Sequence, residues 1–132
     1  MTKQFLNPPG LSQPPSYRQV VMASGGTLVF VSGQVALDAQ SQLIGSGDLR
    51  TQTRQVFENL KTALAAAGAS FADVVKITTY IVNYTPADRE VLAEVRGRYL
   101  SNENPPASTL IGVQALARED FLIEIEATAV VE

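Results

Sequence analysis

Apolar side chains recur at helical spacing in the middle of the chain. Val56, Leu60 and Leu64 follow one another every four residues, which places them on one face of an α-helix. Asp48 is a residue type that caps helix N-termini, and Gly68 is a type that commonly ends helices. The pattern therefore predicts a helix between these two residues.

A second stretch with helical spacing lies further along the chain. Val91 and Val95 again lie four residues apart, and they follow Thr85 and Pro86. A threonine cap followed by proline at the first helical position is a typical helix start. We expect this helix to end near Leu100.

The remaining apolar stretches are rich in β-branched and aromatic residues, which favour strands. Ser24-Gly25-Gly26 separates the first two stretches and has the composition of a tight turn, so a hairpin is expected there. The predicted strands cover residues 17–23, 27–32, 74–84, 108–114 and 121–131.

The last of these strands alternates strictly between apolar and polar positions. Ile123, Ile125 and Ala127 share one face, whereas Glu124 and Glu126 share the other. Since successive side chains on a strand point to opposite faces, the apolar set is expected to pack under the helices. The opposite face must be covered by water or by another subunit.

The predicted order of elements is β-β-α-β-α-β-β, which indicates an α+β fold with a mixed sheet and both helices on one face. A chain of 132 residues, of which 45% are hydrophobic, is the size of one domain with one core. Residues 1–132 are therefore expected to form a single domain.

Charge and composition narrow the possible functions. The formal net charge is −3, and the ten Lys and Arg residues form no run, which argues against binding to nucleic acid and against ribonuclease activity. The chain contains no histidine and no cysteine, the residues most used for general-base catalysis and for binding transition metals. No metal and no cofactor are expected.

No segment reaches the roughly 20 apolar residues that are needed to cross a bilayer, and the N-terminus does not resemble a secretion signal. No membrane partner and a cytoplasmic location are therefore the default expectation.

Three local groups could carry chemistry. Glu124 and Glu126 could hold or transfer a proton, although both could equally be solvated residues on an open strand. Ser32-Gly33-Gln34 could present a hydroxyl and backbone N–H groups to a ligand, or be a simple turn. Tyr17 follows a run of prolines and could cover a pocket or belong to the core.

Taken in order, several short motifs along nearly the whole chain resemble the Rid family of reactive intermediate deaminases, also called the YjgF/RidA type. These motifs are Pro15-Ser16-Tyr17, Val31-Ser32-Gly33-Gln34, Gln52-Thr53-Arg54-Gln55 with Asn59-Leu60 and Ala66-Ala67-Gly68, Val75-Lys76-Ile77-Thr78-Thr79-Tyr80, Pro106-Ala107-Ser108-Thr109 and Ile123-Glu124-Ile125-Glu126-Ala127-Thr128-Ala129.

The resemblance implies a chorismate-mutase-like fold and a homotrimer whose sheets face inward, with a cleft between each pair of subunits. It also implies hydrolysis of reactive enamines and imines to carbonyl compounds and ammonia, without metal or cofactor. Glu124 would then be the catalytic residue, acting on the attacking water, while Tyr17, Ser32, Gly33 and Ser108 would bind the small metabolite.

The chain departs from the family pattern at two positions of this site. Ala93 lies near the place of an asparagine that many members carry on the second helix, and Ser108 is the other position. Where the deaminase branch has a substrate-binding arginine in its Pro-Ala-Arg-Ser turn, this sequence has Ser108. A hydroxyl lacks the charge and the forked geometry with which an arginine binds a carboxylate. A module that binds a small metabolite without turnover is therefore the alternative to a deaminase.

Overall fold

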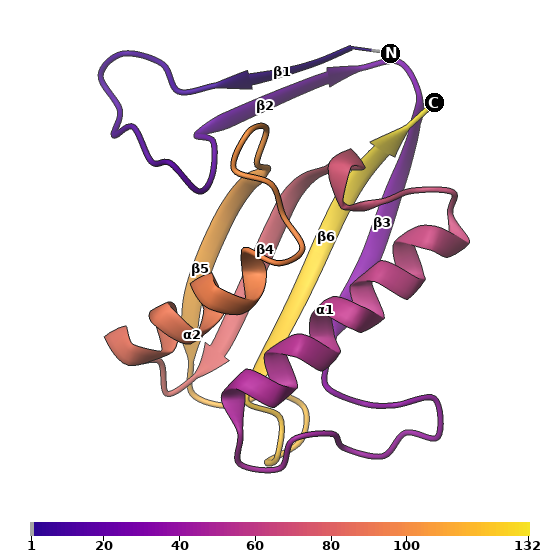
Figure 1. Ribbon diagram of the computed structural model, residues 1–132, viewed down its shortest axis with the longest axis vertical. Coiled ribbons are helices and arrows are strands. Elements are labelled where there is room, and N and C mark those ends of the chain that lie inside the picture. The colour runs from indigo at the N-terminus through magenta and orange to yellow at the C-terminus, as the bar shows by residue number, and fades with distance from the viewer. Residues whose placement is uncertain (1) are drawn as a thin grey trace.

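The structure, a computed structural model that describes residues 2–132, places two α-helices on one face of a four-stranded sheet (Figure 1). A two-stranded sheet lies across one end. The elements in chain order are β1 (Thr2–Leu6), β2 (Val20–Ser24), β3 (Thr27–Gln34), α1 (Leu49–Ala66), the 3-10 turn η1 (Phe71–Asp73), β4 (Val74–Val82), α2 (Pro86–Arg96), β5 (Ala107–Val113) and β6 (Ile123–Val131).

The four-stranded sheet is mixed, as the order of elements predicts. Its strand order is β3-β6-β4-β5. β6 pairs antiparallel with both β3 and β4, whereas β4 and β5 run parallel and are connected through α2. The strands β3 and β5 therefore form opposite edges of the sheet.

The core lies between the helices and the sheet. The alternation in β6 is confirmed, because Ile123, Ile125 and Ala129 are buried on the helix side. Val56 and Leu60 of α1 are fully buried against them. The apolar face of α1, which repeats every 3.6 residues, thus packs against the apolar face of β6, which repeats every 2 residues.

The helix starts agree with the caps read from the sequence. The Asp48 carboxylate accepts a hydrogen bond from the Thr51 backbone N–H at 3.2 Å, which caps α1. α2 begins at Pro86, directly after Thr85. It ends at Arg96 instead of near Leu100, and the following residues form further turns.

The predicted hairpin between the first two strands is wrong. β2 pairs with β1, a strand that the sequence pattern did not indicate, and β3 pairs with β6. Gly25 and Gly26 form a bend between β2 and β3, with φ of 73° and 76°. The chain before β2 is held at the opposite edge of the sheet by the Arg18 backbone N–H, which donates to Pro106 at 3.2 Å, so β2 crosses the sheet end instead of running beside β3 (Figure 1).

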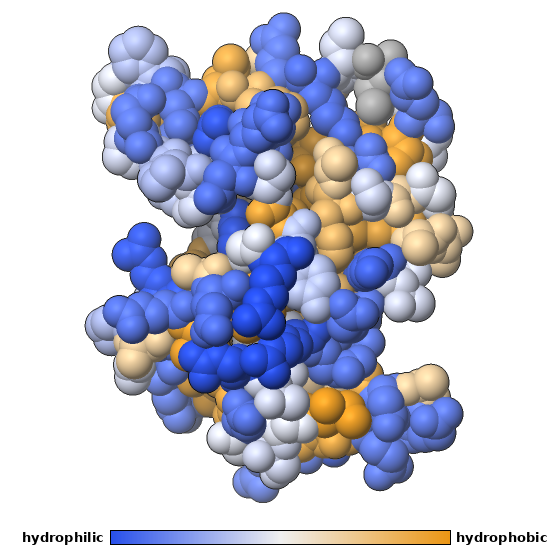
Figure 2. Space-filling view, in the orientation of Figure 1, coloured by the Kyte–Doolittle hydropathy of each residue, from blue (hydrophilic) through white to orange (hydrophobic). Residues whose placement is uncertain are grey.

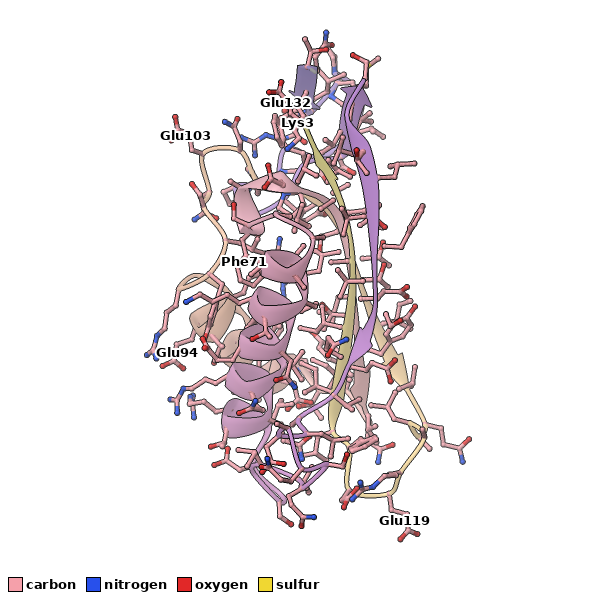
Figure 3. The ribbon with its side chains drawn as sticks, turned by 90° about the vertical axis from the view of Figure 1, so that its right-hand side faces the viewer. Lys3, Phe71, Glu94, Glu103, Glu119 and Glu132 are labelled. Carbon is pink, nitrogen blue, oxygen red and sulfur yellow. The ribbon has the colours of Figure 1, made fainter. Side chains whose placement is uncertain are left out.

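The two sides of the sheet differ in what covers them. Viewed edge-on, the helices lie on one side and no helix or strand covers the other (Figure 3). On this open face, Phe30 is 75% exposed and Leu28 is 61% exposed. By contrast, strongly hydrophilic side chains gather over α1 and α2 (Figure 2), where Arg50 donates a hydrogen bond to Glu94 at 2.9 Å.

One buried amide connects α1 to the segment that leads into β6. The side chain of Gln52 is fully buried. Its Nε2 donates to the carbonyl oxygens of Gly45 at 3.1 Å and Asp120 at 2.9 Å, and its Oε1 accepts from the Leu122 N–H at 2.9 Å. The Gly45 carbonyl oxygen also accepts from the Asp48 N–H at 3.0 Å, so Gln52 matters most for the backbone groups of Asp120 and Leu122.

Replacing Gln52 with methionine is expected to lower the free energy of unfolding by roughly 2–5 kcal/mol, because a buried polar group that loses its partner costs about 1–3 kcal/mol. Urea unfolding at a fixed protein concentration measures the change. Gln40→Met is the matched control, since the Gln40 side chain is exposed and makes no hydrogen bond within residues 2–132. Equal stability of the two variants would contradict the prediction.

Candidate functional site

A pocket of about 360 Å³ lies between α2 and the edge strand β5. The arm before β2 contributes Ser16 and Tyr17 to its wall, β4 contributes Thr79 and β5 contributes Ser108, so three of the motifs read from the sequence meet here. The other lining residues come from β5, α2 and the turn between β4 and α2, and they are Tyr84, Arg89, Leu92, Ala93, Arg96 and Leu110.

Ser108 occupies this pocket together with a guanidinium. Arg96, from the last turn of α2, donates from Nη1 to the Ser108 hydroxyl at 3.0 Å and from Nη2 to the Ser16 carbonyl oxygen at 3.1 Å. Burial lowers the pKa of the Arg96 guanidinium from its ordinary value, yet arginine stays charged in proteins. The pocket therefore contains a positive charge supplied by α2, although Ser108 on β5 carries none.

Sequence reasoning did not identify Arg96 or Arg89. The two residues lie seven positions apart, which is two helical turns and hence the same face of α2. In a predicted helix, this spacing could have indicated that the two cationic side chains lie on the same face.

Gly33 and Glu124 meet on the other side of the sheet. In the pairing of β3 with β6, Val31 lies opposite Ala127 and Gln34 opposite Ile125, so a bulge contains Ser32 and Gly33. The Glu124 side chain lies directly over Gly33, where an added Cβ would come within 2.7 Å of the Glu124 Cδ. Only glycine allows this close approach.

The Glu124 carboxylate has no hydrogen-bond or ion-pair partner in the described part of the chain. Its neighbour on the same face, Glu126, instead accepts a hydrogen bond from the Tyr80 hydroxyl at 2.5 Å. This hydrogen bond raises the pKa of Tyr80, and burial and the charge of Glu126 add to the effect. The two carboxylates of the predicted pair thus differ. Glu126 is exposed and hydrogen-bonded to Tyr80, whereas Glu124 is half-buried and unpaired.

The predicted site residues fall into two groups within one chain. Tyr17 and Ser108 line the pocket beside β5, whereas Gly33 and Glu124 meet at β3 and β6. Ser32 lies in the same bulge as Gly33 and is exposed. The groups also lie on different faces, because Ser108 pairs with the buried Ile77 and Glu124 pairs with Tyr80 of the open face.

Two further features of residues 2–132 bear on function. They contain no group of three or more Asp, Glu, His or Cys side chains arranged to hold a metal ion. None of the helices in this range has the length and apolar character that a membrane span requires.

Comparison with known proteins identifies relatives over most of the chain. Residues 11–131 match the family model described as endoribonuclease L-PSP. A RutC family protein of Pyrococcus horikoshii is 41% identical over 86% of this chain and 85% of its own length. A 2-iminobutanoate/2-iminopropanoate deaminase of Dermatophagoides farinae is 32% identical over 98% of both chains.

The fold also matches a solved structure. A Rid family protein of unknown function from Yersinia pestis superimposes with a TM-score of 0.89 and 40% sequence identity, covering 99% of this chain and all of the other.

Proposed function

The chain belongs to the endoribonuclease L-PSP family, which includes the YjgF, RidA and RutC proteins, and from this premise we propose that it hydrolyses reactive enamines and imines to carbonyl compounds and ammonia. The name of the Dermatophagoides relative supports this reaction class. The observation that carries the proposal is the half-buried Glu124 carboxylate, which lies over Gly33 and has no partner among residues 2–132.

The reaction requires proton transfer to and from water and no oxidant. An enamine first moves a proton from nitrogen to carbon and becomes an imine. Water then adds to the imine carbon, and Glu124 accepts the water proton as the C–O bond forms. Glu124 returns that proton to the nitrogen, which gives the carbinolamine. Glu124 then takes the hydroxyl proton as the C=O bond forms and passes it to the nitrogen, so that the C–N bond breaks and ammonia leaves. A positioned carboxylate can perform these steps in a chain that has no histidine.

The other site residues have roles in binding. The Ser32 hydroxyl and the Gly33 backbone would bind polar substrate atoms and stabilise negative charge. Tyr17 would close the cleft, and Ser108 would line it. These roles require the two groups of residues to come together around one substrate.

We propose that a homotrimer brings the two groups of site residues together. The two groups lie toward opposite edges of the sheet, β5 and β3, so they can meet only between different copies of the chain. Head-to-tail contacts between unlike surfaces close into rings. The open face, with Phe30 and Leu28 exposed, provides an apolar surface for such contacts. A ring of three copies has three such sites.

Ser108 favours one alternative, a metabolite-binding module without turnover. The serine removes the charged group that this strand position supplies to deaminases of the family, so the protein would retain the cleft and bind a ligand without hydrolysing it. Both functions predict a small-molecule ligand, and only the first predicts release of ammonia.

The test is a coupled assay with the full chain. An amino-acid dehydratase generates 2-aminoacrylate or 2-iminobutanoate, and release of the 2-oxo acid and of ammonia is followed over time. Addition of the protein is expected to accelerate both in proportion to its concentration. Unchanged release, together with saturable binding of the 2-oxo acid, would instead support the binding module.

A further inference from the structure

The guanidinium of Arg96 lacks an anionic partner inside the pocket. Three other arginines of the chain form ion pairs: Arg50 and Arg98 contact Glu94, and Arg118 contacts Asp120. Within the described residues, Arg96 makes hydrogen bonds only to two neutral oxygens, those of Ser108 and Ser16.

An unpaired guanidinium at this place is costly unless something binds to it. Burying a charge away from water is unfavourable unless an opposite charge and hydrogen bonds compensate. Arginine has five N–H donors, and the hydrogen bonds to Ser108 and Ser16 leave three of them available. Arg89, which lines the same pocket two helical turns away, adds a second positive charge. The pocket is therefore electrostatically suited to an anion.

Part of the remaining wall of the pocket is apolar. Leu92, Leu110 and the ring of Tyr84 line it. A volume of about 360 Å³ is at the lower end of the range for small-molecule sites. A ligand that fits this combination carries one anionic group at Arg96 and an apolar body against the leucines.

We propose that Arg96 binds the carboxylate of the ligand in place of the arginine that the strand position lacks, with the apolar part of the ligand against Leu92 and Leu110. A planar carboxylate matches the fork of the guanidinium. Ser108 and the Ser16 carbonyl act as positioning groups that hold the guanidinium plane. The assignment of imines as substrates rests on the proposed function, whereas carboxylate binding at Arg96 does not.

The proposal can be tested by calorimetric titration of the full chain. The probes are 4-methyl-2-oxopentanoate and its uncharged amide, which share an apolar body and differ in charge. Arg96→Met is expected to weaken binding of the carboxylate by about 10- to 100-fold, since a charge-assisted hydrogen bond contributes about 1.5–3 kcal/mol. Binding of the amide should change little. Arg50→Met is the matched control, because Arg50 lies on the exposed face of α1 and contacts Glu94, and it should leave both affinities unchanged.

Two further variants separate charge recognition from a purely structural role. Arg96→Lys keeps the positive charge but loses the planar, two-pronged donor geometry of the guanidinium, so it should bind the carboxylate with intermediate affinity. Arg96→Met combined with Ser108→Arg returns a guanidinium to the same pocket from β5, and it should restore the preference for the carboxylate. If Arg96 only links Ser108 to Ser16 structurally, neither variant should show its expected effect. Equal losses of affinity for the carboxylate and for the amide in Arg96→Met would overturn the proposal.

The same variants distinguish this proposal from the proposed function. If the wild type prefers the carboxylate through Arg96 but does not accelerate ammonia release, the deaminase assignment fails and the binding assignment stands. If Arg96→Met hydrolyses the imine of leucine with unchanged KM and kcat, the role of Arg96 is wrong and the deaminase assignment stands.

Discussion

Glu124→Gln is expected to lower the rate of imine hydrolysis by about 10²- to 10⁴-fold, the range that positioned acid–base groups contribute. The amide has nearly the same shape, so it should still fit over Gly33, but it cannot take a proton from water. The loss should therefore appear in kcat, with little change in KM. Single-substrate kinetics in the dehydratase-coupled assay measure both.

Glu126→Gln is the matched control for this prediction. Glu126 lies two residues away on the same face and accepts a hydrogen bond from Tyr80, which an amide oxygen can also accept. The control should retain nearly full activity. Comparable losses in the two variants, or full activity in Glu124→Gln, would remove Glu124 from the mechanism.

Phe30→Glu is expected to dissociate the trimer. The wild type should sediment as three chains of 14.1 kDa, and the variant as one. The dissociation constant should rise by about a hundredfold or more per interface, because central aromatic contacts contribute roughly 2–4 kcal/mol and the new charge would be buried without a partner. Since the proposed site combines residues of two copies, hydrolysis should be lost with assembly.

The control places the same charge on the other side of the molecule. Ala65 is exposed on α1, so Ala65→Glu should remain trimeric and active. Phe30 is 75% exposed in the single chain, so the fold of the Phe30→Glu subunit should be preserved, which circular dichroism can verify. A variant that stays trimeric would show that the open face is not the contact surface.

The elements that the sequence predicted well are those governed by local rules. α1 follows from the Asp48 cap and an apolar face that repeats with the helical period, and α2 follows from Thr85 and Pro86. The burial of β6 follows from strict alternation at Ile123 and Ile125. In each case the deciding interactions are close in sequence or depend only on which face is apolar.

Strand pairing could not be predicted in the same way. Gly25 and Gly26 are compatible with a hairpin, but they form only a bend. The partners of the flanking strands were decided by contacts distant in sequence: the Arg18 N–H is hydrogen-bonded to the Pro106 carbonyl oxygen, and β3 pairs with β6 at the end of the chain. Local turn chemistry allows the chain to change direction but does not set which strands pair.

The candidate site shows the same division. Gly33 and Glu124 do meet, and Tyr17 and Ser108 do share a pocket. The separation of these two groups depends on strand order, which no local motif encodes. Arg96 reaches the pocket because α2 packs beside β5, so its role depends on tertiary structure and on the reach of a long side chain.

The close approach between Gly33 and Glu124 has one more effect on the chemistry. The backbone confines the carboxylate by excluded volume, without hydrogen bonds that would occupy its lone pairs. An ionised carboxylate offers about four acceptor sites. Its orientation is thus restricted while its acceptor sites stay open to water, so a residue without a side chain would position the carboxylate for the proposed proton transfer.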